Sequence, residues 1–302
     1  MTASAVRTPS SSVAAPALSP LPQLLYEPLV RAALIEDLGL GGDLTSEATI
    51  ASGVLARAAF VARTPGVLAG LDVALLAFRL LDPHVTVDIG LHDSAPLESR
   101  ALIATLVGNA RALLGAERTA LNVLSHLSGI ATTTARYVAA LGDARCAIAE
   151  TRKTLPGLRA LQKYAVRAGG GANHRFRLDD AVLIKDNHVA LAGGIAAALA
   201  AVRARAGHRV KIEIEVDTLA QLDAVLEHDG DVDAILLDNF SLVDTHEAVR
   251  RIGGRMIVEA SGGITLDNIA ELARSGVDVI SVGALTHSVV ALDIGLDVVP
   301  SP

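Results

Sequence analysis

The sequence predicts an α/β protein whose C-terminal half is a closed β/α barrel. After about residue 140, short apolar runs alternate regularly with helical segments, and most runs end in a charged residue or a glycine. Near-continuous apolar strands that alternate with helices are typical of a parallel sheet buried on both faces. Six or more such units follow one another, which is enough to close a barrel with its chemistry at the C-terminal ends of the strands.

The first 140 residues mix helices and strands and carry no chemical motif of their own. Apolar residues three to four apart predict the helices, and alternation of apolar and polar residues predicts the strands. In chain order, we expect a helix over 27–38 that ends at Gly39, a strand over 54–63, a helix over 70–82, a strand and turn over 85–97, an extended segment over 101–110 and a long helix to about 140.

The apolar runs of the second half end in polar residues. The runs and their last residues are CAIAE to Glu150, DAVLIK to Lys185, VKIEIE to Glu215, DAILLD to Asp238, MIVEA near Glu259 and DVISVG to Gly283. Helical segments such as TLAQLDAVLEH lie between them. A buried apolar strand gains nothing from a charge at its end, so the repetition predicts a polar mouth at one end of the barrel.

Composition excludes several classes of function. The chain has a formal net charge of -7 and contains three Tyr, four Phe and no Trp. Duplex binding needs a basic face and single-strand binding needs aromatic platforms, so we expect no nucleic-acid partner. The single cysteine, Cys146, excludes an internal disulfide, and its apolar neighbours predict a plain core residue.

The same sequence predicts neither a membrane span nor secretion. The longest uncharged apolar run, VALAGGIAAALAAV over 189–202, is shorter than the roughly 20 residues of a spanning helix. Residues 1–22 are rich in Ser, Ala and Pro, and Pro16 and Pro20 interrupt any candidate signal-peptide core. We therefore expect a disordered tail over 1–22, no membrane partner and a cytoplasmic location.

Two glycine motifs follow the last two predicted strands. VEASGGIT contains Ser261, Gly262 and Gly263, and VISVGALTH contains Gly283 and Ala284. Glycine lets the backbone approach a ligand closely, and free N–H groups at a helix start attract anions. Because the last two loops of a β/α barrel often bind phosphate, we predict a phosphate site here. The alternative is that these glycines only make tight turns.

Glu215 and Asp238 end adjacent predicted strands, so we expect their carboxylates to converge. Two such groups suit Mg²⁺ with several retained waters, the hydroxyls of a sugar, or a developing positive charge. The alternative is a pair of acids in surface loops. Glu213 shares the inner face of its strand with Glu215, because side chains alternate along a strand, and inward charges indicate a polar barrel interior.

The segment ETRKTLPGLRALQKYAVRAGGGANHR, residues 150–175, is cationic in an acidic chain. Arg159, Lys163 and Arg167 recur at every fourth position of a predicted helix, and we interpret them as a solvated helix face. The glycines of AGGGAN do not form a dinucleotide fingerprint, because His174 stands where a third glycine is expected.

Five other basic residues lie at strand ends or in loops around the predicted mouth: Arg152, Lys153, His174, Arg175 and Lys185. Arginine grips a carboxylate with two N–H groups, whereas lysine acts as a compact point charge. A site that holds both indicates a ligand with carboxylates as well as phosphates.

At these residues the chain closely resembles the quinolinate phosphoribosyltransferase family (nicotinate-nucleotide pyrophosphorylase, carboxylating). The resemblance rests on TRKTLPGLRALQKYAVRAGGGANHR, LIKDNH, EIEVDTLAQLD, ILLDNF, EASGGI and SVGALTH, with EDLGLGGDLTS and GAERTALNVLSHLSGIAT upstream. It covers nearly everything from about residue 25 to the end, in order. One departure is EHDGDVDA, which is slightly long and lies away from the motif residues.

The resemblance implies a fold, an activity and an assembly. The fold is an N-terminal α/β sandwich over 23–128, to which 288–302 returns, and a seven-stranded, type II phosphoribosyltransferase-like β/α barrel over 129–287. The activity is transfer of phosphoribose from phosphoribosyl pyrophosphate to quinolinate with decarboxylation, which gives nicotinate mononucleotide, pyrophosphate and carbon dioxide in de novo NAD biosynthesis. The implied cofactor is Mg²⁺, and the implied assembly is a homodimer whose active sites are completed across the interface.

The resemblance also implies a role for each motif residue. Quinolinate would be bound by Arg152, His174, Arg175, Lys185 and, from the neighbouring subunit, Arg118. Phosphoribosyl pyrophosphate would be bound by Lys153, Glu215, Asp238, Ser261, Gly262, Gly263, Gly283 and Ala284. Metal would be held at Glu215 and Asp238, and the catalytic set would be Lys153, Lys185, Glu215 and Asp238.

Three other functions remain open from the residues alone. A Schiff-base aldolase on the same barrel would use Lys153 or Lys185 as its nucleophile. A non-catalytic relative would bind a sugar phosphate without turnover. A related transferase for another aromatic acid, such as nicotinate, is the closest competitor, although two or more arginines with a histidine favour a dicarboxylate.

Overall fold

The computed structural model describes residues 18–300, so the predicted disordered tail lies outside the described residues over 1–17. The N-terminal part is built on an antiparallel sheet of four strands in the order β12-β1-β5-β3. The strands are β1 (Leu55–Ala62), β3 (Thr86–Ile89), β5 (Leu102–Asn109) and β12 (Ile294–Pro300). The chain therefore returns to this sheet at its end, where β12 pairs antiparallel with β1.

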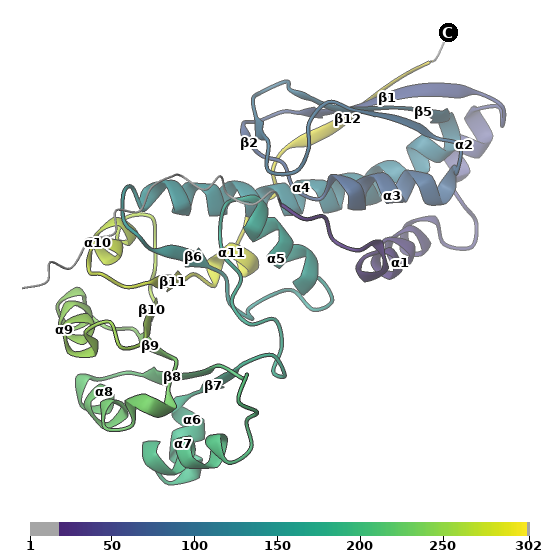
Figure 1. Cartoon of the computed structure of the whole chain (residues 1–302). Helices are drawn as coiled ribbons and strands as arrows, with labels where there is room; N and C mark the ends of the chain where they lie inside the picture. The colour runs from purple at the N-terminus through teal and green to yellow at the C-terminus, as the bar shows by residue number, and fades with distance from the viewer. Residues whose placement is uncertain (1–17, 301–302) are drawn as a thin grey trace, which may run out of the picture.

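Helices cover one face of this sheet (Figure 1). They are α3 (Leu71–Leu81) and the first half of α4 (Ala110–Ala140), with η1 (Gln23–Leu25), α1 (Glu27–Leu38) and α2 (Leu44–Thr49) around them. Between the layers, Phe60 of β1 meets Phe78 of α3 edge to face, with ring centroids 5.7 Å apart. Two short strands, β2 (Gly66–Val67) and β4 (Pro96–Leu97), pair beside them. The predicted α/β sandwich is confirmed, and α2 is the helix that the sequence did not predict.

The C-terminal part is built on a parallel sheet of six strands in the order β6-β11-β10-β9-β8-β7. The strands are β6 (Ala147–Ala149), β7 (Val182–Ile184), β8 (Ile212–Val216), β9 (Ala234–Asp238), β10 (Ile257–Ser261) and β11 (Val279–Ser281). The helices are α5 (Arg159–Ala168), α6 (Asp186–Ala192), α7 (Ile195–Arg203), α8 (Leu219–Leu226), α9 (Leu242–Ile252), α10 (Ile269–Arg274) and α11 (Ala284–His287), with η2 (Asp229–Asp231) before β9. Helices α8, α9 and α10 lie on the outer face of the curved sheet (Figure 1).

The predicted seven-stranded, closed ring differs from this sheet in one place. Six strands are formed, and within residues 18–300 the two end strands, β6 and β7, do not pair. On the free side of β6, Ala149 forms a single parallel bridge with Ala172, and this bridge lies beyond the six strands. Three glycines precede this bridge, and a Cβ on Gly169 would lie 2.3 Å from the carbonyl oxygen of Ala131 in α4. The backbone of this segment therefore packs closely against α4.

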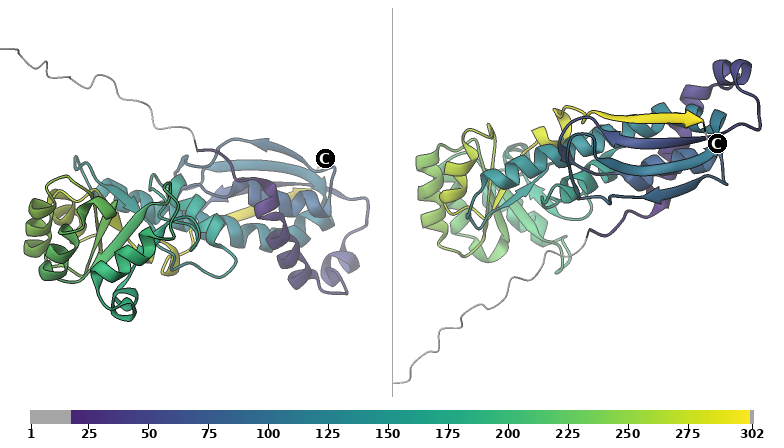
Figure 2. Two further views of the ribbon diagram at one scale, coloured as in Figure 1. Left: turned by 60° about the horizontal axis from the view of Figure 1, so that its bottom comes forward. Right: turned by 90° about the horizontal axis from the view of Figure 1, so that it is seen from above.

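Helix α4 joins the two parts. It is 31 residues long, and it runs from beneath the first sheet to the barrel (Figures 1 and 2). Its N-cap, Asn109, accepts hydrogen bonds from the backbone N–H groups of Arg111 and Ala112, which fixes where the helix begins. Among the described residues, no helix combines the length and apolar character that a membrane crossing requires.

Cys146 immediately precedes β6 and is half buried, so the predicted core residue packs at the edge of the hydrophobic core. Burial raises the pKa of its thiol to about 11, with a smaller contribution from Asp278. Because the thiolate is the reactive form, we expect the native thiol to resist thiol reagents at pH 8. Titration with a disulfide reagent should show slow labelling in buffer and one fast equivalent after unfolding. Fast labelling of the native chain would contradict this expectation.

Candidate active site

The inner face of the parallel sheet carries a polar layer at the C-terminal ends of its strands. Side chains alternate along a strand, and in-register neighbours of a parallel sheet point to the same side. Glu215 of β8 lies opposite Leu236 of β9, which lies opposite Glu259 of β10. Two residues further along, Asp238, Ser261 and Ser281 form the next row. The predicted polar mouth is therefore built by strand register.

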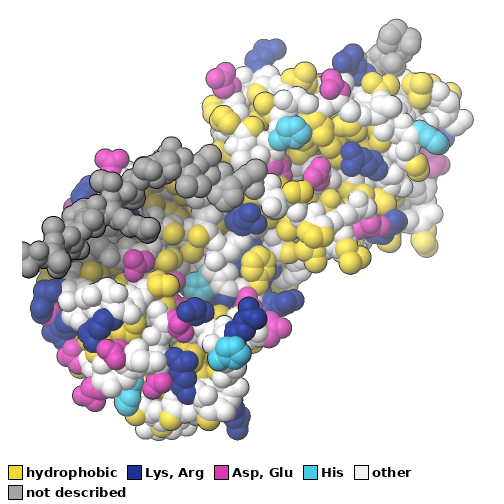
Figure 3. Space-filling view, viewed as in Figure 1, with side chains coloured by type: hydrophobic (Ala, Val, Ile, Leu, Met, Phe, Trp, Pro, Cys, Tyr) yellow, Lys and Arg dark blue, Asp and Glu magenta, His cyan; other side chains and the backbone are white. Residues whose placement is uncertain are grey.

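These rows line a cavity of about 370 Å³, a size suited to a small-molecule ligand. Its lining residues are Thr151, Arg152, Lys153, His174, Arg175, Leu183, Lys185, Glu215, Leu236, Asp238, Glu259, Ser261 and Ser281. Eight of the predicted site residues are among them, and they come from six loops or strand ends. Lys, Arg and His side chains gather beside Asp and Glu on the barrel part, whereas the N-terminal part shows broader apolar areas on the same face (Figure 3).

Five predicted residues do not line this cavity. Gly262, Gly263 and Gly283 lie directly beyond the ends of β10 and β11, and Ala284 is the first residue of α11. Gly283 borders the cavity, because a Cβ on it would lie 3.0 Å from Cδ of Lys153. Arg118 lies on α4 and lines a separate hollow of about 450 Å³ with residues 291–294.

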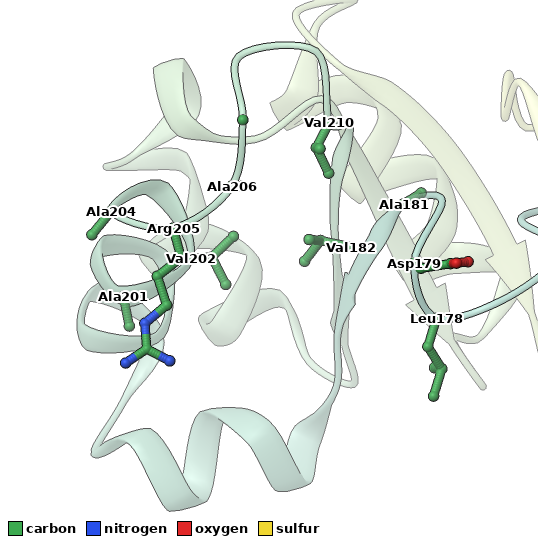
Figure 4. Close-up of a pocket in the computed structure, with 11 residues that line it drawn as sticks. Leu178, Asp179, Ala181, Val182, Ala201, Val202, Ala204, Arg205, Ala206 and Val210 are labelled. Atoms are coloured by element: carbon green, nitrogen blue, oxygen red, sulfur yellow. The ribbon is translucent and has the colours of Figure 1, made fainter.

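A larger hollow of about 760 Å³ lies elsewhere, between α7, the loop after it and β7 (Figure 4). Its side chains are mostly apolar, and Asp179 and Arg205 are its only charged lining residues. None of the predicted site residues lines it. Convergent polar groups mark a catalytic site better than volume does, so the smaller cavity is the candidate active site.

The two predicted metal-binding carboxylates face this cavity from adjacent strands. Glu215 forms an ion pair with Lys185, and its own side chain is 9% exposed. Asp238 accepts a hydrogen bond from Nδ2 of Asn239 at 2.8 Å. Carboxylate oxygens on neighbouring strands fit Mg²⁺, which keeps several waters and takes one or two protein carboxylates. Because Lys185 already neutralises Glu215, this donor set would suit a metal that also has anionic ligands from outside the protein.

Two arginines in the cavity have unused hydrogen-bonding capacity. Nε of Arg152 and Nε of Arg175 are both buried and have no hydrogen-bond partner within the described part of the chain. Burial lowers the pKa of Arg175, and the neighbouring charge of Arg152 lowers it further. Buried donors without acceptors are costly, and two like charges repel. An anion bound between the two arginines would relieve both costs.

His174 is held below the cavity by two acids. Its Nε2 lies 3.2 Å from Oε2 of Glu213 and 3.4 Å from Oε1 of Glu259. Burial alone would lower the pKa of His174, but the hydrogen bonds and charges of Glu213 and Glu259 raise it to about 10. Its Nδ1 accepts the backbone N–H of Arg175 at 2.7 Å, which instead favours a neutral ring protonated on Nε2.

Nε2 of His174 carries a proton both in the charged ring and in this neutral ring, and this has two consequences. His174, Glu213 and Glu259 lie close enough to hold a metal ion, but a protonated Nε2 is not a metal ligand. Both ring nitrogens are already engaged within the protein, so in this arrangement His174 offers a ligand no free N–H group. The arginines and lysines are left as the direct donors to an anion.

Three residues of the segment 150–175 lie in other surroundings than the sequence predicted. Lys163 is fully buried rather than on a solvated face, and it forms an ion pair with Glu150, which is also fully buried. Arg159 is half buried, and of the three helix cations only Arg167 is exposed. Glu150 therefore does not belong to the polar mouth, because it faces α5 and not the cavity.

Several lining residues were missed. Glu259 was recognised only as the end of an apolar run, and Ser281, which shares a row with Ser261, was not recognised at all. Both lie two residues from a residue that was noted, Ser261 and Gly283, so the period of two along the strands was the signal that could have assigned them to the site. Asn239 has a positive φ of 56°, and its N–H donates to the carbonyl of Ser261 at 2.9 Å. A Cβ on Gly262 would lie 2.1 Å from Oδ1 of Asn239. This glycine is thus needed for the close approach of the two loops that follow β9 and β10. No pattern in the sequence predicts that approach.

Comparison with known proteins gives a consistent picture. The family models for the N-terminal and C-terminal domains of quinolinate phosphoribosyl transferase match residues 43–128 and 130–297. A carboxylating nicotinate-nucleotide pyrophosphorylase from Mycobacterium leprae is 51% identical over 276 residues, which are 89% of this chain and 95% of that protein.

Solved structures agree. NadC from Streptococcus pyogenes matches with a TM-score of 0.90 and 40% identity, over 94% of this chain and 100% of that one. The nicotinate-nucleotide pyrophosphorylase from Francisella tularensis matches with a TM-score of 0.87 and 38% identity, over 93% of this chain and 98% of that one. Human nicotinic acid phosphoribosyltransferase, at 14% identity and a TM-score of 0.59, shares the fold alone.

Proposed function

The chain belongs to the quinolinate phosphoribosyltransferase family, and we propose that the cavity at the C-terminal ends of its parallel strands is where phosphoribose is transferred to quinolinate. The enzyme is a pentosyltransferase of NAD biosynthesis, and its products are nicotinate mononucleotide, pyrophosphate and carbon dioxide. One observation supports this location most directly: the buried, unpartnered donors of Arg152 and Arg175 lie in one cavity with Glu215 and Asp238. Such a cavity accepts a dicarboxylate on one side and a sugar on the other.

The transfer step needs no protein nucleophile. The lone pair of the pyridine nitrogen forms a bond to the anomeric carbon, and the bond from that carbon to pyrophosphate breaks with its electrons on the leaving oxygen. Positive charge develops on the ribose, and the carboxylates of Glu215 and Asp238 have the correct sign to stabilise it. Mg²⁺, when bound with the substrate phosphates, supplies charge neutralisation of the leaving group. Lys153, which lines the cavity beside Gly283, adds positive charge on the same side.

Decarboxylation follows from the product of the first step. The quaternary pyridine nitrogen carries a positive charge, so the electron pair left when the adjacent carboxylate departs as carbon dioxide is stabilised in the ring. That carbon then takes a proton from water. Arg152 and Arg175 hold the dicarboxylate in the orientation that the transfer requires, which is the main contribution of the protein on this side.

The loops after β10 and β11 are the proposed site for the 5′-phosphate. Gly262 and Gly263 have positive φ angles of 93° and 61°, and Asn268 braces their loop through Nδ2 to the carbonyl of Gly263 at 2.9 Å. Its Oδ1 accepts the N–H of Thr265 at 2.9 Å, and α10 begins only at Ile269. Backbone N–H groups in such a braced glycine turn suit a phosphate. Ser261, Gly283 and Ala284 complete the proposed site.

We further propose a homodimer in the cytoplasm, with Arg118 of each subunit serving the cavity of the other. Two observations support the dimer. Arg118 lines a hollow of its own, away from the cavity of its own chain. Large apolar side chains are exposed on the N-terminal part, including Ile35, Leu40 and Leu44, which are 71%, 110% and 72% exposed. Exposed apolar areas of this kind often mark protein interfaces.

The proposed function is tested with purified protein, Mg²⁺ and phosphoribosyl pyrophosphate, offering quinolinate and nicotinate in separate reactions. We expect pyrophosphate and carbon dioxide in equal amounts with quinolinate, no turnover with nicotinate, and loss of turnover when the metal is chelated. Equal products require that each transfer be followed by one decarboxylation. Pyrophosphate without carbon dioxide, or turnover with nicotinate, would contradict the dicarboxylate assignment. A borohydride-trapped adduct on Lys153 or Lys185 would instead indicate the aldolase.

A further inference from the structure

A fully buried ion pair lies behind the loop that carries His174 and Arg175. Lys163 of α5 donates to the carboxylate of Glu150, which directly follows β6, and both side chains are 0% exposed. Neither residue lines the cavity. Burying two charges costs more than their attraction returns unless further hydrogen bonds satisfy them, and an apolar pair of the same volume is often as stable. Stability alone therefore does not account for this buried pair, and its other hydrogen-bond partners indicate a further role.

Those partners are the backbone groups of His174. Nζ of Lys163 donates to the carbonyl oxygen of His174 at 2.9 Å, and Oε1 of Glu150 accepts the N–H of His174 at 3.1 Å. One residue earlier, Nδ2 of Asn173 donates to Oε2 of Glu150 at 3.0 Å and to the carbonyl of Lys163 at 2.9 Å. One residue beyond Arg175, the ring of Phe176 lies 4.9 Å from Nζ of Lys163. The pair thus contacts the loop on both sides of the residues that line the cavity.

Side-chain contacts, and not regular strand pairing, hold this loop in place. It follows the glycines at 169–171, and its regular pairing ends with the single bridge at Ala172. A flexible loop would have to be ordered when a ligand binds, which weakens binding, whereas a loop fixed in advance avoids this cost. The two buried charges fix one backbone N–H and one backbone C=O at the same residue, which sets the course of the chain into Arg175.

We propose that Glu150 and Lys163 are positioning residues that fix the loop backbone at His174, so that Arg175 is held in place to receive a carboxylate of the substrate. This inference rests on the proposed function of the cavity. The pair acts through the loop backbone and does not touch the ligand. It is expected to affect the dicarboxylate side of the cavity and to leave the phosphoribosyl pyrophosphate side, carried by β8 to β11, unchanged.

The test uses the full chain with both charges removed, as the double variant Glu150→Gln with Lys163→Met. Glutamine keeps an acceptor for the N–H of His174, methionine keeps the length of the lysine, and no unpaired charge is left in the core. We expect the double variant to fold with the melting temperature of the parent within a few degrees. We expect its quinolinate Kd, measured by calorimetry, and its quinolinate KM to rise about tenfold, with the KM for phosphoribosyl pyrophosphate within about twofold. Arg167→Met, an exposed cation on the same helix, is the matched control and should change neither KM.

Each other outcome is decisive. A folded double variant with parent-like quinolinate binding would overturn the proposal. Equal losses for both substrates, or a double variant that does not fold, would overturn it as well, because the pair would then serve the fold in general. The variant Arg175→Ala separates a failure of the proposed quinolinate site from a failure of the proposed role of the buried pair. If Arg175→Ala leaves quinolinate binding unchanged, the proposed site is wrong, whereas if it alone weakens binding, only the role of the buried pair is wrong.

Discussion

Replacing Glu215 with glutamine is expected to lower kcat by about a hundredfold or more, in the range reported for the loss of one group that stabilises transition-state charge. Glu215 faces the cavity from the end of β8, and its side chain is 9% exposed, so solvent cannot replace its charge. The substitution keeps the size of the side chain and removes the negative charge that opposes the positive charge on the ribose. Lys185, its partner, is 44% exposed and stays solvated, so the fold should be unaffected.

The measurement is a steady-state assay of pyrophosphate release with both substrates saturating. Glu247→Gln provides a matched control. Glu247 lies on α9, outside the cavity, where hydrogen bonds from Arg250 and then Arg251 lower the pKa of its carboxyl to about 2. The control should keep the parent kcat. A Glu215→Gln variant with kcat within threefold of the parent would show that this carboxylate does not face the developing charge.

Replacing Arg175 with alanine is expected to weaken quinolinate binding by about 10-fold to 150-fold, the equivalent of losing one charged hydrogen-bond partner at about 1.5–3 kcal/mol. Arg175 keeps Nη1 on the carbonyl of Ala181 at 3.1 Å, while its buried Nε has no partner within residues 18–300. The free donor is therefore available to a carboxylate. Removing Arg175 also removes its repulsion with Arg152, so the melting temperature should not fall.

Calorimetry with quinolinate measures this effect directly. Arg177→Ala is the control, because Arg177 lies two residues further along the same loop, is 73% exposed and pairs with Asp179 outside the cavity. The control should bind quinolinate like the parent. An Arg175→Ala variant with unchanged quinolinate affinity would refute the assignment of the dicarboxylate site to this arginine.

The barrel strands and the acids at their ends were predictable because both depend on local sequence. Apolar runs mark parallel strands, and a charge at the end of a run marks the polar end of the sheet, which is how Lys185, Glu215 and Asp238 were found. Glu150 also ends an apolar run, but it does not line the cavity. Ala149 is in register with Ser281 of the cavity, so the next residue, Glu150, points the other way, towards α5. A shift of one residue along a strand therefore decides whether a side chain points into the cavity or into the protein core.

The rest depends on contacts between segments far apart in the chain. Lys163 has helical spacing with two other cations, and only its distant partner Glu150 reveals that it is buried. The inward turn of His174 needs Glu213 and Glu259 from two different strands. Gly169 packs closely on α4 three residues before the single bridge at Ala172, and no periodicity in the sequence indicates that contact. The resemblance assigned His174 to the site, but it did not give the direction in which this side chain points.

The long helix α4 makes the two parts of the enzyme inseparable. The two matched domains meet at residues 128–130, and this junction falls inside α4, where Leu127, Ser128, Gly129 and Ile130 are all buried. A Cβ on Gly129 would lie 2.2 Å from the carbonyl oxygen of Val290, so the return segment is wedged against the helix at the same level. A chain divided at this junction would give two fragments, each with half of a helix and an exposed apolar stripe. The two parts therefore share one continuous, buried helix. We expect the barrel and the N-terminal part to unfold together and not as separate units.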